Sequence, residues 1–166
     1  MKKKPLGILF LIAFLTLLTS CGSPESNAIK LVKNGCLPPI SETKIGKAAD
    51  VFFEKAKYDA FYADDGNLYV NVYGQVNLKK MQKRILATDV MKENMSKKDA
   101  KQAVDGLGIL FGSGEVLYQF AVPSEDYFNV YAVTVDGEGL NSSDRMLFLQ
   151  MLLDDYENLM AYIFYN

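Results

Sequence analysis

Residues 58–76, with the sequence YDAFYADDGNLYVNVYGQV, carry the clearest structural pattern in this chain. Residues 58–63 and 68–76 are rich in aromatic and β-branched side chains, which predicts two strands. Between them stands Asp64-Asp65-Gly66-Asn67, and Asp-Gly in this position is typical of a tight antiparallel turn. The stretch therefore predicts a β-hairpin.

The second of these strands alternates between two kinds of side chain. Successive side chains of a strand point to opposite faces of a sheet, so the alternation sorts the strand into an inner and an outer set. The inner set is Leu68, Val70 and Val72, and the outer set is Tyr69, Asn71 and Tyr73.

A second hairpin is predicted further along the chain. Residues 115–122 and 127–135 have the composition of strands, and Pro123-Ser124-Glu125-Asp126 separates them with turn-forming residues. The same alternation divides their side chains between the two faces. The inner set is Val116, Tyr118, Phe120, Phe128 and Val130, and the outer set is Gln119, Tyr127, Asn129 and Tyr131.

Two amphipathic patterns predict helices that cover the inner face. In residues 44–57, apolar positions recur at helical spacing after Thr43, a suitable N-cap. Ser142 is expected to cap a last helix. The first stripe is Ile45, Ala48, Ala49, Phe52, Phe53 and Ala56, and the second is Met146, Leu149, Leu153, Tyr156 and Met160.

Residues 77–101, in the middle of the chain, are rich in Lys and Met and have only a weak pattern. Ser96-Lys97-Lys98-Asp99 resembles a capping box, with Asp in place of Glu, and predicts a short helix that stops at Gly106.

Together these elements predict an α+β fold, a single two-layer domain at residues 29–166. The sheet is expected to have four antiparallel strands with helices on one face, because strands joined by tight turns form meanders. The expected order is α-β-β-(α)-β-β-α.

The composition is that of a globular chain, with 166 residues of which 49% are hydrophobic. Residues 21–166 contain 15 Lys or Arg and 20 Asp or Glu, a net charge of −5. A mildly acidic domain has no broad attraction for nucleic acid.

His is absent, which removes the usual general base at neutral pH and the commonest metal ligand. No metal or other cofactor is expected.

The amino terminus has the layout of a secretory signal peptide over residues 1–20. Lys2, Lys3 and Lys4 form a basic start, and residues 6–18 form an almost wholly apolar run. As a helix this run would span about 20 Å, short of the roughly 30 Å hydrocarbon core, so a transmembrane anchor is not favoured. The following Leu18-Thr19-Ser20-Cys21 resembles the lipobox of bacterial lipoproteins.

The resemblance to lipoproteins implies that the thiol of Cys21 receives diacylglycerol and that the leader is cleaved before this residue. Two or three acyl chains hold a protein on a membrane durably. Residues 21–28 are then the lipidated cysteine and a flexible tether. In a Gram-negative lipoprotein, Gly22 in place of Asp implies the outer membrane.

Cys36 is left without a disulfide partner if Cys21 carries a lipid. It is either a reactive or intermolecular thiol, or a small, partly buried residue in a loop. Gly35 before it and Pro38 after it favour the loop.

Residues 28–160 resemble a group of small bacterial lipoproteins and phage-associated proteins that share a "VKNG…TIG…FF" start. The residues that carry this resemblance are Lys33-Asn34-Gly35, Thr43-Lys44-Ile45-Gly46 and Phe52-Phe53. The resemblance implies no activity and assigns no functional residue.

The sequence lacks the catalytic motifs sought in it. Residues 106–112, GLGILFG, miss the dinucleotide-binding spacing by one residue. Residues 136–141, DGEGLN, superficially resemble a calcium loop, but its fifth position needs an oxygen ligand and is occupied by Leu140. A non-enzymatic binding or envelope-assembly module that contacts another envelope protein is therefore favoured. The alternative is a carboxylate-dependent hydrolase acting on envelope glycan, which needs two acidic side chains roughly 5–9 Å apart in a cleft.

The outer face of the sheet is the candidate contact surface. Rigid tyrosine rings beside amides are typical of recognition surfaces, although Tyr also suits any half-exposed sheet. The candidate residues are Tyr69, Asn71, Tyr73, Gln119, Tyr127, Asn129 and Tyr131.

Overall fold

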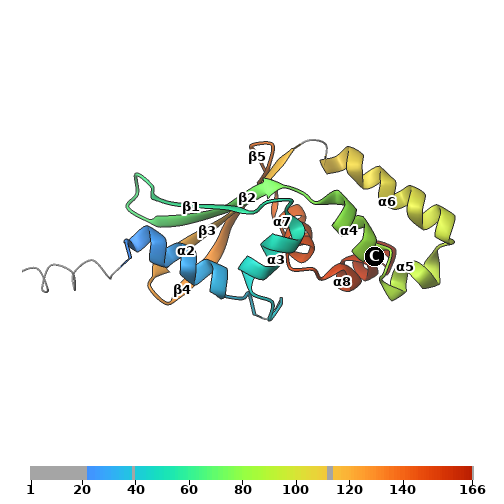
Figure 1. The fold of residues 1–166 in the computed structure, drawn as a ribbon, viewed down its shortest axis with the longest axis horizontal. Coiled ribbons are helices and arrows are strands. Elements are labelled where there is room, and N and C mark those ends of the chain that lie inside the picture. The colour runs from blue at the N-terminus through green and yellow to red at the C-terminus, as the bar shows by residue number, and fades with distance from the viewer. Residues whose placement is uncertain (1–21, 39, 112–113, 166) are drawn as a thin grey trace, which may run out of the picture.

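A five-stranded antiparallel sheet forms the centre of the fold, which confirms the predicted α+β class (Figure 1). The computed structural model describes residues 22–38, 40–111 and 114–165. The strands lie in the sheet in the order of the sequence. They are β1 (Lys57–Tyr62), β2 (Leu68–Gln75), β3 (Glu115–Ser124), β4 (Tyr127–Val135) and β5 (Glu138–Gly139).

The four predicted strands are present, and β5 is an addition that the sequence analysis did not predict. Asp136 and Gly137 have φ values of 53° and 83° and reverse the chain after β4. Two residues then pair with Thr134 and Val135. The prediction of four strands was wrong by one, because a two-residue strand is too short to show a pattern.

The first hairpin closes as predicted. The Ala63 amide donates to the Asn67 carbonyl at 2.9 Å, and Gly66 adopts a φ of 79°, which glycine tolerates at no steric cost. The Asp65 carboxylate accepts hydrogen bonds from the Asn67 amide at 2.9 Å and from its side chain at 2.8 Å. These bonds hold the pKa of Asp65 below its ordinary value.

Three helices cover one face of the sheet: α2 (Pro24–Asn34), α3 (Ile45–Phe52) and α7 (Ser142–Leu152). In Figure 1, α2 and α3 lie below β1 and β2. The predicted inner side chains of the two central strands point toward them, and Tyr118 donates a hydrogen bond from its hydroxyl to the Phe148 carbonyl of α7 at 2.7 Å. The fully buried members of the inner set are Val70, Val72, Val116, Tyr118 and Phe120.

Three aromatic rings fill the centre of the layer between helices and sheet. Phe52 and Phe53 meet edge to face with ring centroids 4.9 Å apart. Tyr118 lies 6.0 Å from Phe52 and 6.2 Å from Phe53, again edge to face. Aromatic pairs favour this geometry, so the three rings fix how α3 sits on the sheet.

The flexible tether predicted up to residue 28 is wrong from Pro24 onward, where α2 begins. Ser23 caps this helix by accepting a hydrogen bond from the Ser26 amide at 3.3 Å, and Pro24 stands at the first helical position, where its missing N–H is harmless. Ala28 and Val32, one turn apart, are buried. Their burial holds this polar segment in a helix.

The helix predicted at 44–57 is shorter than expected. It ends at Phe52, and Phe53 instead forms a β-bridge with Val76 while its ring stays buried. The predicted cap at Thr43 is also wrong, because the N-cap is Lys44 and has no side-chain cap bond. The chain must leave the helix early because β1 begins at Lys57 and has to align with β2.

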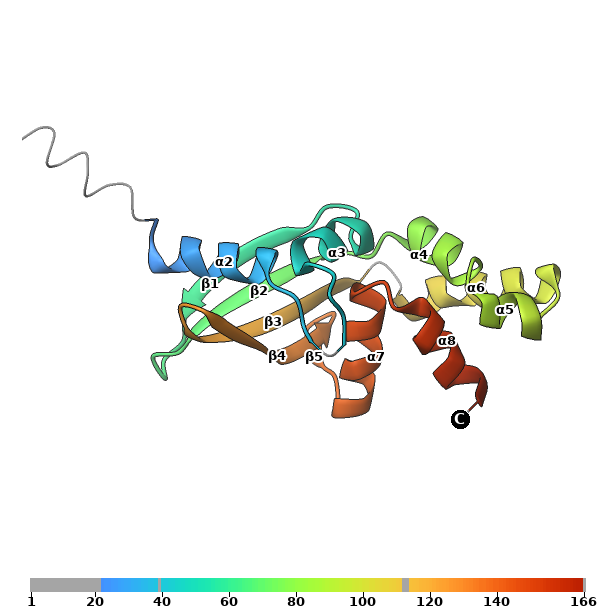
Figure 2. The same cartoon turned by 90° about the horizontal axis from the view of Figure 1, so that it is seen from below.

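A helical lobe lies beyond one end of the sheet (Figure 2). It contains α4 (Leu78–Ile85), α5 (Asp89–Asn94), α6 (Lys97–Phe111) and α8 (Tyr156–Tyr165). The Ser96 hydroxyl donates to Asp99 at 2.7 Å and accepts from its amide at 3.3 Å, which confirms the predicted cap. The predicted stop at Gly106 is wrong, because α6 continues to Phe111.

The single last helix predicted from Ser142 is two helices, α7 and α8. Asp154, with a φ of 65°, breaks the helical path between them. The predicted cap at Ser142 is wrong by one residue, because the N-cap is Asn141, whose side chain accepts a hydrogen bond from the Asp144 amide at 3.0 Å, and Ser142 is the first helical residue. Met146 is 46% exposed, whereas the other four members of the predicted stripe are buried.

Truncation of Phe52 to Ala is expected to lower the free energy of unfolding by about 3–5 kcal/mol, because it removes a buried ring from the three-ring cluster. Met146→Ala is the matched control, since its exposed side chain should change stability by no more than about 0.5 kcal/mol. Urea denaturation measures both. Equal effects would show that the Phe52 ring is not part of the core.

Tyr58 gives the fold a dependence on alkaline pH. Its hydroxyl is buried and has no hydrogen-bond partner among the described residues. Burial, and secondarily the charge of Asp50, raises the pKa of Tyr58 to about 12. In the unfolded chain Tyr ionises near pH 10, so from about pH 10 upward the unfolded state binds fewer protons and stability falls.

Tyr58→Phe is therefore expected to keep or raise stability near neutral pH, because it removes a buried hydroxyl without a partner. It should also reduce the loss of stability between about pH 9 and about pH 11.5, where Tyr58 contributes to that loss. Denaturation midpoints of both proteins at the two pH values test this. The same alkaline loss in both would contradict it.

Candidate functional site

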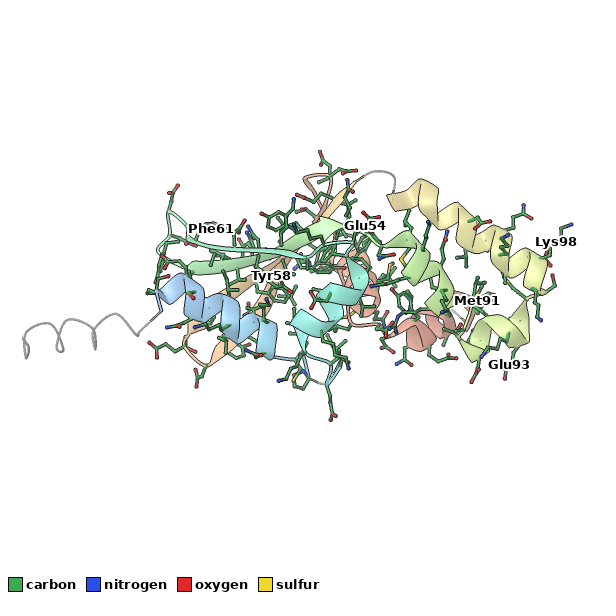
Figure 3. The ribbon with its side chains drawn as sticks, in the orientation of Figure 1. Glu54, Tyr58, Phe61, Met91, Glu93 and Lys98 are labelled. Atoms are coloured by element: carbon green, nitrogen blue, oxygen red, sulfur yellow. The ribbon has the colours of Figure 1, made fainter. Side chains whose placement is uncertain are left out.

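The face of the sheet opposite to α2 and α7 is the candidate site and is called the open face here. In Figure 3, Phe61 lies on the side of β1 opposite to Tyr58, and Tyr58 lies on the side of the helices. The strand register aligns outward side chains in rows, such as Phe61, Tyr69 and Ala121, or Asp59, Asn71 and Gln119. The open face contains Phe61, Tyr69, Asn71, Tyr73, Gln119, Tyr127, Asn129 and Tyr131.

Three of these rings form an aromatic cluster. Phe61 stacks on Tyr69 with centroids 5.8 Å apart, and Tyr131 meets Tyr69 edge to face at 4.9 Å. Tyr69 is only 6% exposed as a result, while Phe61 is 39% and Tyr131 54% exposed. The prediction that Tyr69 is an available contact residue was therefore wrong, because its neighbours on both sides cover it.

Burial has raised the pKa of the Tyr69 hydroxyl, and the charge of Asp65 adds to this effect. The same hydroxyl donates a long hydrogen bond of 3.4 Å to the Asp65 carboxylate. The cluster is therefore fastened to the turn of the first hairpin. A fixed set of rings loses little further conformational freedom when another surface packs on it.

Beside the cluster lies a pair of amides. Gln119 donates from Nε2 to Asn71 Oδ1 at 3.0 Å across two neighbouring strands. The remaining two amide atoms, Asn71 Nδ2 and Gln119 Oε1, have no hydrogen bond in the part of the chain that the structure describes. Both remain half-buried, so they offer one donor group and one acceptor to a partner.

A β-bulge sets the position of Tyr131. Gln119 pairs with Ala132 and Phe120 with Val130, so Tyr131 has no opposite residue in β3. The bulge lets Tyr131 point outward while Val133 stays buried. Arg145 of α7 donates to the carbonyl of Tyr131 at 3.0 Å, which satisfies a group of the interrupted ladder.

Tyr73 stands at the far end of the open face and is half-buried. Burial, and then the charge of Asp59, raises its pKa. The Lys57 ammonium lies 5.5 Å from its ring centroid, within reach of a cation–π contact. Tyr73 is thus engaged on both sides. Tyr127, 55% exposed, and Asn129, also exposed, are the free members near the cluster.

Phe61 is the open-face residue that the sequence analysis missed. The alternation of Lys57, Asp59 and Phe61 with Tyr58 and Ala60 contained the signal. This signal did not predict which face of the strand is buried, because a strand of six residues with aromatic side chains on both faces shows no clear difference between an apolar and a polar face.

Two surface clefts formed by described residues do not supply a pair of carboxylates. One, of about 400 Å³ between α4 and α6, is lined by Asp105 as its single acid, and the other, of about 800 Å³ near Gly22, by Glu125. The described residues contain no group of three or more His, Cys, Asp or Glu that could hold a metal ion. Asp136, in the loop that superficially suggests calcium binding, accepts from the Glu115 amide at 3.0 Å.

Neither pair of adjacent aspartates forms a dyad. Asp154 makes an ion pair with Arg84, and Asp155 accepts a hydrogen bond from the Asn158 amide group at 2.9 Å. Asp65 holds the hairpin turn. These carboxylates thus have structural partners.

Of the two cysteines, Cys21 lies outside the described residues, and Cys36 is a free, half-buried thiol. Among the described residues, none of the helices combines the length and the apolar character that crossing a membrane requires.

Comparisons with models of protein families, with curated proteins and with solved structures gave no match. The resemblance to small lipoproteins therefore stays a prediction from the sequence.

Truncation of Tyr69 to Ala is expected to destabilise the domain more than truncation of Tyr127 to Ala. The Tyr69 ring is buried between two others, whereas the Tyr127 ring is half-exposed and replaceable by water. Urea denaturation of both variants at neutral pH tests this order. The reverse order, or two equal losses, would show that the cluster is not packed.

Proposed function

We propose that this chain is a lipid-anchored lipoprotein of the bacterial envelope and that it binds a partner protein through the open face of its sheet. The observation that carries the proposal is the aromatic cluster, in which the ordered ring of Tyr69 supports the exposed ring of Tyr131, on the same strand as Tyr127 and on the same face as the amide pair. Aromatic side chains that are already ordered and flanked by amides are enriched at interfaces. The proposal assigns the chain no catalytic role.

The anchor follows from the residues before the domain. Cys21 ends a lipobox-like segment, and only Gly22 and Ser23 separate it from the first helical residue, Pro24. Fully extended, two residues reach roughly 7 Å. A lipid on Cys21 would therefore hold the domain close to the bilayer, with the end of the sheet near Gly22 facing the membrane. In a Gram-negative cell, Gly22 favours the outer membrane.

Replacement of Cys21 by Ser is expected to abolish lipid attachment, because a hydroxyl does not replace the thiol that receives the lipid. Labelling of cells with palmitate followed by membrane fractionation measures this. Cys36→Ser is the matched control and should label like the parent. If the Cys21 variant is still labelled and still sediments with membranes, the proposal that Cys21 carries the lipid anchor is wrong.

The partner contact is tested by photo-crosslinking in intact cells. A photoreactive amino acid at Asn129, on the open face, is expected to give a discrete adduct with a partner protein, whereas one at Lys47, an exposed residue of α3, is not. Replacement of Tyr127 and Tyr131 by Ser should then remove the Asn129 adduct. Circular dichroism verifies that this double variant is folded.

Two results would contradict this docking surface. One is an adduct at Lys47 with none at Asn129. The other is an Asn129 adduct that is unchanged in the folded double variant, which would place the contact away from the tyrosines.

A further inference from the structure

Charge is distributed very unevenly along this chain. Residues 78–111, which form α4, α5 and α6, contain eight Lys or Arg and four Asp or Glu, a net charge of +4. The remainder of residues 21–166 contains seven basic and 16 acidic residues, a net charge of −9. The mildly acidic average of the whole chain therefore conceals a basic segment, α4 to α6, within an acidic remainder.

A groove of about 400 Å³ runs between α4 and α6 in this lobe. Lys79 and Lys83 stand one turn apart on α4, and Lys101 lines the groove from α6. Gln82 of α4 donates to the carbonyl of Val104 in α6 at 3.3 Å and so ties the two helices together. The groove is a shallow channel between two helices, with lysines from both.

The floor of the groove is apolar. Leu86, Ala87 and Val104 line it, and Leu86 is 36% exposed. Asp105 is the single carboxylate at the groove, so three ammonium groups face one acid. An apolar floor between cationic walls complements a segment that has apolar side chains on one side and carboxylates at its edges.

The lysines of the groove are not used within the fold. In the part of the chain that the structure describes, Lys79, Lys83 and Lys101 have no carboxylate within 4.0 Å. The other basic residues that do form ion pairs in the lobe are Arg84, with Asp154, and Lys92, with Asp89 at 2.7 Å. Three positive charges at one groove are thus left for an external anion.

We propose that the groove between α4 and α6 binds an acidic amphipathic segment of a partner protein. A nucleic acid or phosphate polymer is less well matched, because the groove has no aromatic side chain for base stacking and no arginine for bidentate phosphate contacts. The apolar floor would also contribute nothing to such a ligand.

The groove lies at the end of the molecule opposite to Gly22. Strand β2 starts at Leu68, which lines the same cleft as Gly22, and ends at Gln75, just before α4. Figure 1 shows the start of α2 and the α4–α6 pair at opposite ends, and in Figure 3 Lys98 marks the outer end of α6. The groove exists whether or not Cys21 carries a lipid, and it is separate from the open face.

The probe is a fluorescein-labelled 16-residue peptide of Glu and Leu with Leu at helical spacing, added to the full chain in detergent. Fluorescence anisotropy is expected to show saturable binding that weakens as NaCl is raised. Replacement of Lys79, Lys83 and Lys101 by Gln should weaken binding at least about tenfold, because three charge contacts are lost. Replacement of the same three by Arg should preserve it.

The matched control is a triple Gln variant at three exposed lysines outside α4 to α6, Lys30, Lys44 and Lys47. It has the same change in net charge and should bind the peptide within about twofold of the parent. Leu86→Gln should also weaken binding, and a peptide of Glu alone should bind more weakly than the Glu–Leu peptide. Circular dichroism verifies that each variant is folded.

Several outcomes would overturn the proposal. Absence of saturable binding would show that the groove is not a binding site for the peptide. Equal losses of affinity in the two triple Gln variants would show that only the net charge of the surface attracts it. Polyphosphate bound as tightly as the Glu–Leu peptide would indicate a general polyanion site. Light scattering that shows dimers of the parent and monomers of the Lys79, Lys83 and Lys101 variant would make a second copy of the chain the occupant.

Discussion

The alternation of side chains along β2 and β3 sets which residues enter the core and which face outward. Val70 and Val72 on β2 and Tyr118 on β3 are fully buried beneath the helices, which forces Asn71 and Gln119 to the other face. A shift of one residue in either strand would exchange the two faces. The inner side chains also require the cover of α2, α3 and α7, so the core and the open face are consequences of one register.

On the open face, exposure and rigidity come from different residues. The ring of Tyr69 is buried and supports its two neighbours. Phe61 and Tyr131 cover this ring and remain in contact with solvent. The bulge in β4 makes this possible, because it adds one residue at Tyr131 and restores the inward direction at Val133. The hydrogen bond from Arg145 to the Tyr131 carbonyl couples this bulge to α7, so the open face is supported from the helical layer.

The molecule carries two surfaces of different chemistry at separate places. The open face is aromatic and rich in amides, and the groove of the helical lobe is cationic with an apolar floor. A lipid on Cys21 would hold the end of the sheet near Gly22 against the membrane and direct the lobe away from it. The two proposed contact surfaces therefore lie along the side of the sheet and at the end of the molecule opposite to Gly22.

Both hairpins, the inner and outer residues of the strands, the covering helices α3 and α7 and the cap at Ser96 could be predicted from the sequence, because these depend on local periodicity and turn chemistry. The helix at Pro24, the continuation of α6 past Gly106 and the break at Asp154 could not, and they appear only in the folded chain. In each of these three places the structure differs from what the local sequence pattern favours. Only the structure showed that Tyr69 is covered and that Lys79, Lys83 and Lys101 share one groove. Such contacts join residues far apart in the chain, and no local pattern records which distant side chains will meet.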